Sequence, residues 1–288
     1  MKYGAHCYLF IDKWTDNSVE LFEKAGEIGL DFLEISVGDD VSFSTAPVRK
    51  KMAETGIEVT IGPGAEWPMQ CDLSSDNPEE RLLGLEWHKK QVDLCHEIGA
   101  IAYAGAIYGH AGMIKRRPPP PEEYQYTAEG LHLLGEYAAE KGVVVVLEPM
   151  SHFRTHLVNT PEQMLRLVKM SDHPNLKISL DTYHLVTEIV DYHEAILTVK
   201  DYLWGMHMCE NNRGVPGRGI VPWEQVFTGL TEIGFESYML FESYNSSIEK
   251  GTFAFSRGMF HDVCADGADF VKEGISFIEE GMAAAAGN

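Results

Sequence analysis

Short apolar runs alternate with amphipathic stretches along almost the whole chain, and this alternation limits the possible folds more than any other feature of the sequence. An apolar run of about 4–8 residues rich in β-branched side chains is typical of a strand buried on both faces, as in a parallel sheet. The stretches between the runs have helical periodicity, and several end just before a glycine, such as Gly29, Gly56 and Gly99. The expected strands are 2–9, 32–36, 58–62, 100–106, 143–148, 177–181, 203–208 and 237–242.

Eight strand–helix pairs joined by right-handed crossovers close most simply into a single (β/α)8 TIM barrel. A doubly wound open sheet is the alternative, but no G-x-G-x-x-G motif follows the first strand. Because the sequence has no internal repeat, composition break or linker, we expect one domain over residues 1–288. The expected helices are 18–28, 46–55, 79–98, 128–141, 161–170, 192–198, 222–233 and 268–282.

Two long loops are expected at the face formed by the carboxyl ends of the strands, over residues 63–77 and 108–126. The second contains four consecutive prolines, Pro118 to Pro121, which cannot lie inside a helix because proline lacks the amide hydrogen that the helix needs. Such a run is stiff, and its usual role is to fix the path of a connection.

Four potential metal ligands follow the last four apolar runs, at roughly even intervals along the chain. In a barrel the carboxyl ends of all strands meet at one face, so residues that are distant in sequence become neighbours. A charged side chain buried there is costly unless something pairs with it, and three acids with one imidazole suit Mn²⁺, Mg²⁺ or Co²⁺ better than a structural zinc ion. One such residue alone is as well explained by ordinary hydrogen bonding, but the set together predicts a metal centre. The four are Glu148, Asp181, His207 and Glu242.

Further polar residues lie close to these ligands in the sequence. His184 follows Asp181 in DTYH, and Arg213 lies in the loop after His207. Arg213 is suited either to holding substrate oxygens or to pairing with surface acids. Glu210 is a candidate for orienting Arg213 or a ligand histidine. No phosphate-binding loop of the G-x-x-x-x-G-K-[ST] type occurs.

The chain is strongly acidic, with 23 Lys and Arg against 44 Asp and Glu and a net charge of −21. Such a surface repels phosphate backbones and anionic lipids, so we expect neither nucleic acid nor a membrane as partner, and a neutral substrate fits better than a polyanion. The N-terminus lacks a signal-peptide pattern, and no apolar run approaches the roughly 20 residues that span a bilayer. The five scattered cysteines indicate reduced thiols, and we expect a cytoplasmic protein.

The sequence around the ligands resembles the ketose 3-epimerases that act on D-tagatose and D-psicose, which belong to the xylose-isomerase-like TIM barrels. The resemblance rests on the ligand segments, the H-x-x-E-x-x-R stretch that begins at His207, the VPGRG after it and the Pro-Trp pair at 222–223. It extends through most of the chain, from Trp14 to Asp262, and is strongest from the first ligand to the last.

The resemblance implies that the four ligands bind Mn²⁺ or a similar ion. It also implies that Glu148 and Glu242 double as the acid and base, and that His184 and Arg213 contact the sugar. A metal held by the C2 carbonyl and the C3 hydroxyl would acidify the C3 proton and stabilise a cis-enediolate. Epimerisation removes a proton from one face and returns one to the other, so two carboxylates on opposite faces suffice.

This chain departs from the family pattern at two places. The family has a substrate-contacting Glu six residues after the first ligand, where this chain has Arg154. The family's Trp-Arg-Asp near the end is replaced by Phe260, His261 and Asp262. A positive group in place of a negative one changes which hydroxyls or carboxylates can be held, so the metal chemistry is better supported than the substrate.

Several aromatic residues fall near expected strand ends or loops of the same face, where rings can stack on the apolar face of a sugar. Packing in the core or rim explains each of them equally well. His6 and Glu34, in the first two strands, either reach the sugar or satisfy neighbouring polar groups. The aromatic candidates are Trp14, Trp67, Tyr108 and Phe153.

The favoured function is a metal-dependent ketose 3-epimerase acting on a free, unphosphorylated sugar. Aldose–ketose isomerisation, dehydration of a keto-inositol and cleavage of a 3-keto-glycoside pass through related enediolates, and Arg154 keeps them open. The net charge disfavours a metal-dependent abasic-site endonuclease, and the complete ligand set disfavours a non-catalytic sugar-binding barrel. The resemblance also suggests a homodimer or homotetramer, although no stripe in the sequence identifies an interface.

Overall fold

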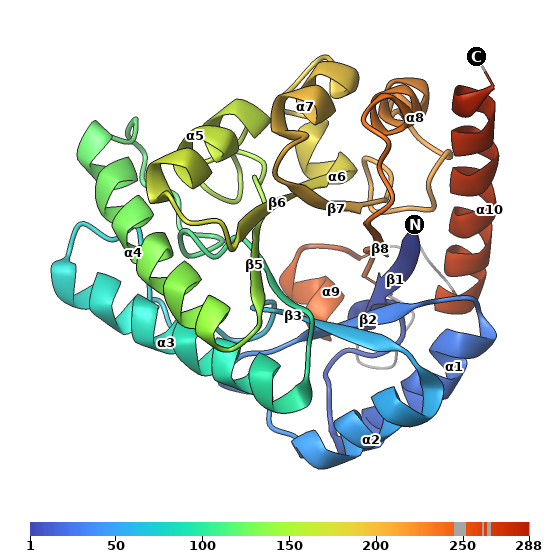
Figure 1. Ribbon diagram of the computed structural model, residues 1–288, viewed down its shortest axis with the longest axis horizontal. Coiled ribbons are helices and arrows are strands. Elements are labelled where there is room, and N and C mark those ends of the chain that lie inside the picture. The colour runs from blue at the N-terminus through green and yellow to red at the C-terminus, as the bar shows by residue number, and fades with distance from the viewer. Residues whose placement is uncertain (245–251, 261, 264–265, 288) are drawn as a thin grey trace.

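The eight strands form a closed parallel barrel in which each strand pairs with its sequence neighbours and β8 pairs with β1. The computed structural model describes residues 1–244, 252–260, 262–263 and 266–287. Figure 1 shows the helices arranged as a ring around the strands, which confirms the predicted (β/α)8 barrel. The strands are β1 (Lys2–His6), β2 (Phe32–Ser36), β3 (Glu58–Gly62), β4 (Ala102–Gly105), β5 (Val144–Leu147), β6 (Leu176–Asp181), β7 (Leu203–His207) and β8 (Tyr238–Phe241).

All eight strands were predicted, but β1 is shorter than expected. It ends at His6, whose side chain accepts a hydrogen bond from the Tyr8 amide and so caps a 3₁₀ turn, η1 (Cys7–Leu9). The side-chain acceptor diverts the backbone from the strand ladder. The chain after residue 6 therefore turns away from the sheet.

The helices match the expected segments, with two short additions and one earlier start. Pro121 occupies the first turn of α4, where a missing amide hydrogen costs nothing, so the helix begins inside the loop that was expected to reach residue 126. Helix α9 lies near the middle of Figure 1 rather than in the outer ring. The described helices are η2 (Asp16–Glu20), α1 (Leu21–Glu27), α2 (Thr45–Thr55), α3 (Pro78–Ile98), α4 (Pro121–Glu140), α5 (Pro161–Ser171), α6 (Thr182–Leu185), α7 (Tyr192–Val199), α8 (Trp223–Glu232), α9 (Thr252–Ser256) and α10 (Gly267–Ala286).

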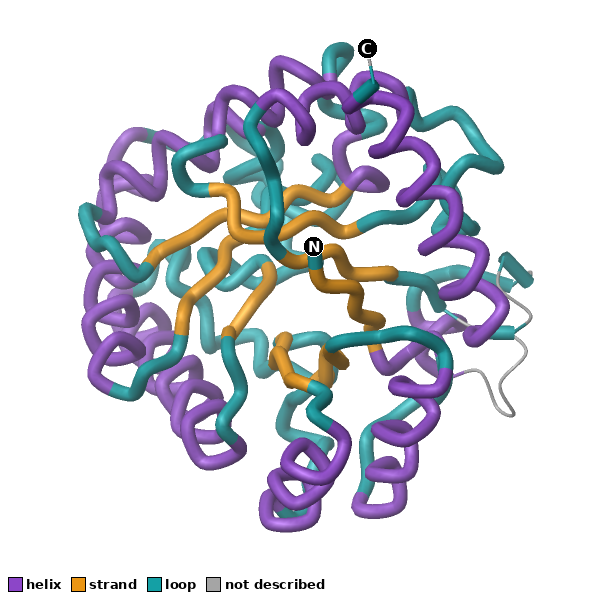
Figure 2. Tube along the Cα trace, turned by 45° about the vertical axis from the view of Figure 1, so that its right-hand side comes forward, coloured by secondary structure: helices purple, strands orange, loops and turns teal. Residues whose placement is uncertain are grey.

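Helix α5 illustrates how the sequence sets the element boundaries. Thr160 and Gln163 form a capping box around Pro161, so the unpaired amides of the first turn find acceptors. Asp172 ends the helix in the left-handed region at φ 48°. Asn77, Asp191 and Asp266 likewise accept amide hydrogen bonds at the starts of α3, α7 and α10, and Figure 2 shows the helical layer outside the sheet.

Two further expectations concern membrane-spanning segments and the cysteines. Within the described residues, no helix combines the length and the apolar character that crossing a membrane requires. Four of the five cysteines are free and buried, whereas Cys264 lies outside the described residues.

Candidate metal and sugar site

The four predicted ligands meet at the carboxyl ends of β5 to β8. One ligand atom from each of Glu148, Asp181, His207 and Glu242 lies within 4.8 Å of all the others. Asp181 and His207 are direct partners in the register of β6 and β7, whereas each glutamate comes one residue after its strand. Because the strands are adjacent staves, residues separated by up to 94 positions in sequence form one compact group.

His207 lies at the centre of this group. Its Nδ1 is 3.1 Å from Glu242 Oε2, 3.6 Å from Glu148 Oε1 and 4.0 Å from Asp181 Oδ2. Burial alone would lower the pKa of this imidazole, but the surrounding carboxylates, Glu148 first, raise it to about 10. Four donors of this kind fit a divalent ion that prefers oxygen and imidazole ligands.

Glu148 provides a separate test of whether a cation fits. Its Oε1 is buried and has no hydrogen-bond partner in the part of the chain that the structure describes, a costly arrangement for a carboxylate oxygen. Burial raises the pKa of Glu148 to about 8, with further contributions from Asp181 and Glu242. A cation at the centre of the group would satisfy this oxygen and favour its ionised form.

Arg213 forms ion pairs with two of the acidic ligands, Asp181 and Glu242. Its Nη1 lies 2.7 Å from Asp181 Oδ2 and 3.2 Å from Glu242 Oε2, and its guanidinium stacks on the Tyr183 ring at 4.1 Å. Although burial alone would raise the pKa of Glu242, Arg213 and His207 lower it well below the usual range. The sequence left open whether Arg213 serves the site or a surface ion pair, and the structure places it in the site.

His184 continues the network away from the ligands. Its Nε2 accepts from Arg213 Nη2 at 3.2 Å, because a guanidinium can only donate. Burial lowers the pKa of His184 to about 3, so the ring is neutral; its Nδ1 lies 2.7 Å from Ser151 Oγ and 3.3 Å from the Ser151 amide nitrogen. These contacts on both ring nitrogens fix the orientation of the imidazole.

Glu210 serves the loop that carries Arg213 rather than the Arg213 guanidinium. Its fully buried carboxylate accepts from the Gly217 amide, the Val221 amide and the Trp223 indole. Its backbone carbonyl accepts from the Arg213 amide at 2.9 Å, and Arg213 itself has a left-handed φ of 64°. The expected orienting role of Glu210 is therefore exerted through the backbone of a tight loop.

At the ends of β1 to β4, on the same face, His6 and Glu34 lie within hydrogen-bond distance of neighbouring hydroxyl groups. His6 Nε2 lies 3.1 Å from Ser36 Oγ, and burial lowers the pKa of His6 to about 4. Glu34 accepts from Thr60 Oγ1 at 3.0 Å, and burial raises its pKa to about 7. These residues satisfy one another, and both His6 and Glu34 also line the cavity.

A cavity of about 280 Å³ opens above the ligands, enough for a small sugar. Most of the expected contact residues line it: His6, Glu34, Trp67, Phe153, Arg154, His184 and Arg213. Trp14 and Tyr108 are not among the described lining residues. Trp14 is 1% exposed and packs edge-on against Phe22 and Phe43, so its expected role as a sugar contact is not supported by its position.

Sequence reasoning missed several lining residues. Tyr244 donates to Glu242 Oε1 at 3.0 Å, and its position two residues after a ligand was an available signal. Arg257 and Phe253 come from α9 and the turn after it, and Phe253 stacks on Tyr8 with ring centroids 3.4 Å apart. The sequence pattern of this segment gave no indication that it lies beside the cavity. Of the departures near the end, His261 lies outside the described residues, and Phe260 is 74% exposed.

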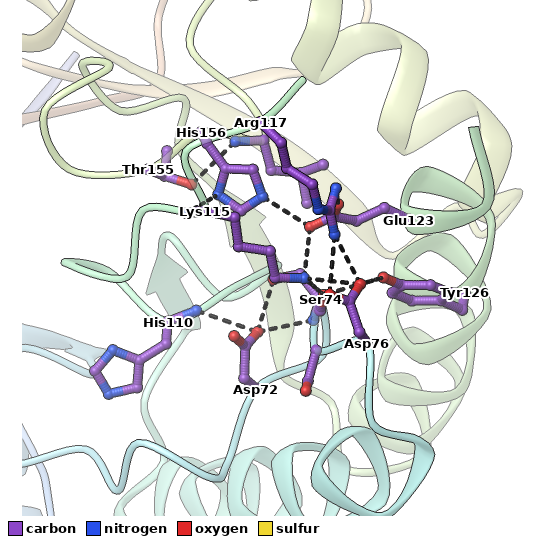
Figure 3. Close-up of polar contacts among 12 residues, drawn as sticks. Asp72, Ser74, Asp76, His110, Lys115, Arg117, Glu123, Tyr126, Thr155 and His156 are labelled. Atoms are coloured by element: carbon purple, nitrogen blue, oxygen red, sulfur yellow. Dashed lines mark hydrogen bonds and ion pairs between the residues drawn. The ribbon is translucent and has the colours of Figure 1, made fainter. Parts of the chain in front are cut away.

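An ion-pair network centred on the buried Glu123 joins the loops around the start of α4 (Figure 3). Glu123 is fully buried and accepts from Lys115 at 2.9 Å, Arg117 at 2.7 Å and His156 at 2.8 Å. Burial opposes ionisation, but these three bonds lower the pKa of Glu123 to about 2. Lys115 and Arg117 also bind Asp76, so the network joins the loops after β3, β4 and β5.

Comparison with known proteins agrees with this geometry. A family model described as "Xylose isomerase-like TIM barrel" matches residues 22–280. The chain belongs to this family. The resemblance inferred from the sequence is thereby confirmed, and the four-residue acidic and histidine group occupies the carboxyl face of a xylose isomerase-like barrel.

Proteins similar to this chain include several named sugar epimerases. The chain is 28% identical to a ketose 3-epimerase of Arthrobacter globiformis, over 99% of this chain and 98% of the relative. It is 27% identical to a 3-dehydro-D-guloside 4-epimerase of Escherichia coli K12, over 84% and 92%. A solved structure of D-psicose 3-epimerase with D-tagatose, from Clostridium cellulolyticum H10, superposes with a TM-score of 0.88 at 25% identity and covers 98% of this chain and 99% of that one.

Proposed function

We propose that this protein is a divalent-metal-dependent ketose 3-epimerase. The observation that carries the proposal is the compact group of one histidine and three carboxylates, two of them glutamates at the ends of the group. Glu148 follows β5 and Glu242 follows β8, so two staves separate them around the barrel. The similarity to named ketose 3-epimerases over nearly the whole chain supports the same reaction.

Glu148 and Glu242 are the proposed acid and base. When bound, a divalent ion supplies Lewis acidity that polarises the sugar oxygens and makes the C3 proton easier to remove. One glutamate takes the C3 proton from one face of the sugar, which leaves an enediolate across C2 and C3. The other glutamate returns a proton to the opposite face. The opposite pKa shifts of Glu148 and Glu242 support such a division of roles.

The neighbouring polar residues position the sugar in this proposal. His184 and Arg213 contact sugar oxygens beside the metal, and their bonds to Ser151 and Asp181 hold them ready. His6 and Arg154, which both line the cavity, contact the remainder of the sugar.

Three finer assignments belong to the same proposal. Mn²⁺ is the proposed native ion, with Mg²⁺ and Co²⁺ as substitutes that the donor set also accepts. The protein is proposed to work in the cytoplasm as one domain that forms a homodimer or homotetramer.

Product analysis by NMR in D₂O tests the reaction. The metal-loaded enzyme should interconvert a ketose with its C3 epimer and incorporate deuterium at C3. A second candidate is epimerisation at C4 of a 3-keto sugar, favoured by the similarity to the E. coli 4-epimerase, and it would place deuterium at C4. Absence of exchange at either carbon, with the metal bound, would refute both.

A further inference from the structure

The cavity is lined by more positively charged side chains than the three ligand carboxylates can pair with once a divalent ion is bound. Arg213 is matched by Asp181 and Glu242, as described above. Arg154 and Arg257 also line the cavity, and among the described residues neither forms an ion pair with a carboxylate. Three ligand carboxylates balance Arg213 and a divalent ion, and burial raises the pKa of Glu34, which also lines the cavity, to about 7. Among the described residues, at least one of the two guanidinium groups therefore remains as uncompensated charge.

Arg154 is the less engaged of the two. Its guanidinium forms no hydrogen bond to any residue that the structure describes, while its backbone is held firmly. Its amide donates to Ser151 O at 2.8 Å, and its carbonyl accepts from the Gly112 amide at 2.7 Å. The ion-pair network around Glu123 anchors the same loop through His156 (Figure 3). The backbone is thus fixed while the charged end is left available to a ligand.

Arg257 approaches the cavity from the α9 side. Its Nη2 donates to Gly64 O at 3.2 Å, its guanidinium lies 4.8 Å from the Phe253 ring, and its buried Nε has no hydrogen-bond partner among the described residues. Burial lowers the pKa of Arg154, and the charge of Arg257 lowers it further, which indicates that the two cations share one region. Leaving the buried Nε of Arg257 without an acceptor is unfavourable unless a ligand supplies one.

From this arrangement we infer that the ketose bound here carries an anionic group, a carboxylate or a phosphate, outside the reacting C2–C3 unit. Guanidinium groups bind both anions with paired N–H···O bonds. This inference rests on the proposed function for the identity of the reacting end. The net charge of −21 favoured a neutral substrate, but in a buried cavity the nearest charges outweigh distant surface charges, which solvent and salt screen.

Matched sugars separate the charge from the rest of the substrate. D-fructose, D-fructuronate and D-fructose 6-phosphate differ only at C6, and D-tagatose, D-tagaturonate and D-tagatose 6-phosphate form a second set. Calorimetric titration of the Mn²⁺-loaded full-length protein measures binding whether or not a sugar is turned over. Deuterium exchange at C3 measures turnover on the same sugars. The uronate and phosphate arms identify which anion the site prefers.

We expect one anionic sugar to bind at least about tenfold more tightly than its neutral counterpart. Arg154→Gln should remove most of this preference, measured as the ratio of the anionic to the neutral affinity within the same variant, because the variant lacks the guanidinium that lines the cavity. Arg257→Gln should reduce the preference in the same direction. Arg154→Lys should retain part of it, since the charge remains without the paired geometry.

Arg49→Gln is the matched control, because it removes the same charge from an exposed position on α2, and it should keep the full preference. Equal or absent binding of the anionic sugars, or an unchanged preference in Arg154→Gln, overturns the inference. Exchange at C3 of the neutral ketoses would then leave the proposed function standing. Preferential binding of an anionic sugar without exchange at any carbon would instead support the inference and refute the proposed reaction.

Discussion

The two halves of the barrel face have the same backbone plan but opposite electrostatic character. The ends of β5 to β8 bring together three carboxylates, a histidine and Arg213, whereas the ends of β1 to β4 carry His6, Glu34 and small hydroxyl groups that satisfy one another. Concentrating charge on one half produces a cation site there. The other half offers neutral hydrogen-bonding groups over which a sugar can extend.

Replacing the glutamates tests this division with the largest expected effect. Glu148→Gln or Glu242→Gln removes a group that transfers a proton and binds the metal, so kcat for C3 exchange should fall by about 10²–10⁴-fold or more. Glu34→Gln, on the neutral half, is the matched control and should lower kcat by less than about tenfold. A Glu34 variant as impaired as the other two would contradict the division, provided that circular dichroism shows all three folded.

Metal binding should release protons, and only from residues at the ends of β5 to β8. Without metal, Glu148 with a pKa of about 8 and His207 with a pKa of about 10 both hold protons at pH 7. Both must lose them to become ligands, so binding at pH 7 should release about two protons and affinity should rise with pH. The rise should be steepest below pH 8 and shallower from pH 8 to 10.

Calorimetry of Mn²⁺ binding in buffers of different ionisation enthalpy measures this release. Glu148→Gln should lower it to about one proton, because only His207 then titrates. Affinity that does not change between pH 6 and 8 would show that the carboxylates are already ionised in the metal-free protein.

Trp14→Phe gives the smallest expected effect and tests whether Trp14 lies outside the sugar-binding cavity. Trp14 is buried against Phe22 and Phe43, and its indole nitrogen has no hydrogen-bond partner among the described residues, so phenylalanine removes volume and an unsatisfied donor together. The free energy of unfolding should fall by less than about 2 kcal/mol. KM and kcat should not change, and a rise in KM would place Trp14 in contact with the sugar.

The charged half was predictable from the sequence because each ligand ends a buried strand. An ionisable residue directly after an apolar run can be located on the barrel without knowing any loop, and this sufficed for Glu148, Asp181, His207 and Glu242. The fold followed from the same runs. The bounds of β1 and α4 differed because a side-chain acceptor at His6 and a proline at the first helical turn decide them locally.

The rim could not be predicted in the same way. Arg257 and Phe253 reach the cavity from a short helix whose position depends on tertiary contacts, not on periodicity. Trp14 was misplaced because the first strand was expected to reach residue 9, which would have carried the chain toward the cavity face. The turn after His6 directs it to the core instead.

The free guanidinium of Arg154 has an evolutionary consequence. A side chain that forms no ion pair or hydrogen bond with the described residues can be exchanged without a compensating change among them, because the loop around it is secured by its backbone and by Glu123. Position 154 is therefore a place where single codon changes can redirect an existing catalyst toward new metabolites. The barrel and its metal chemistry would pass through such a transition intact.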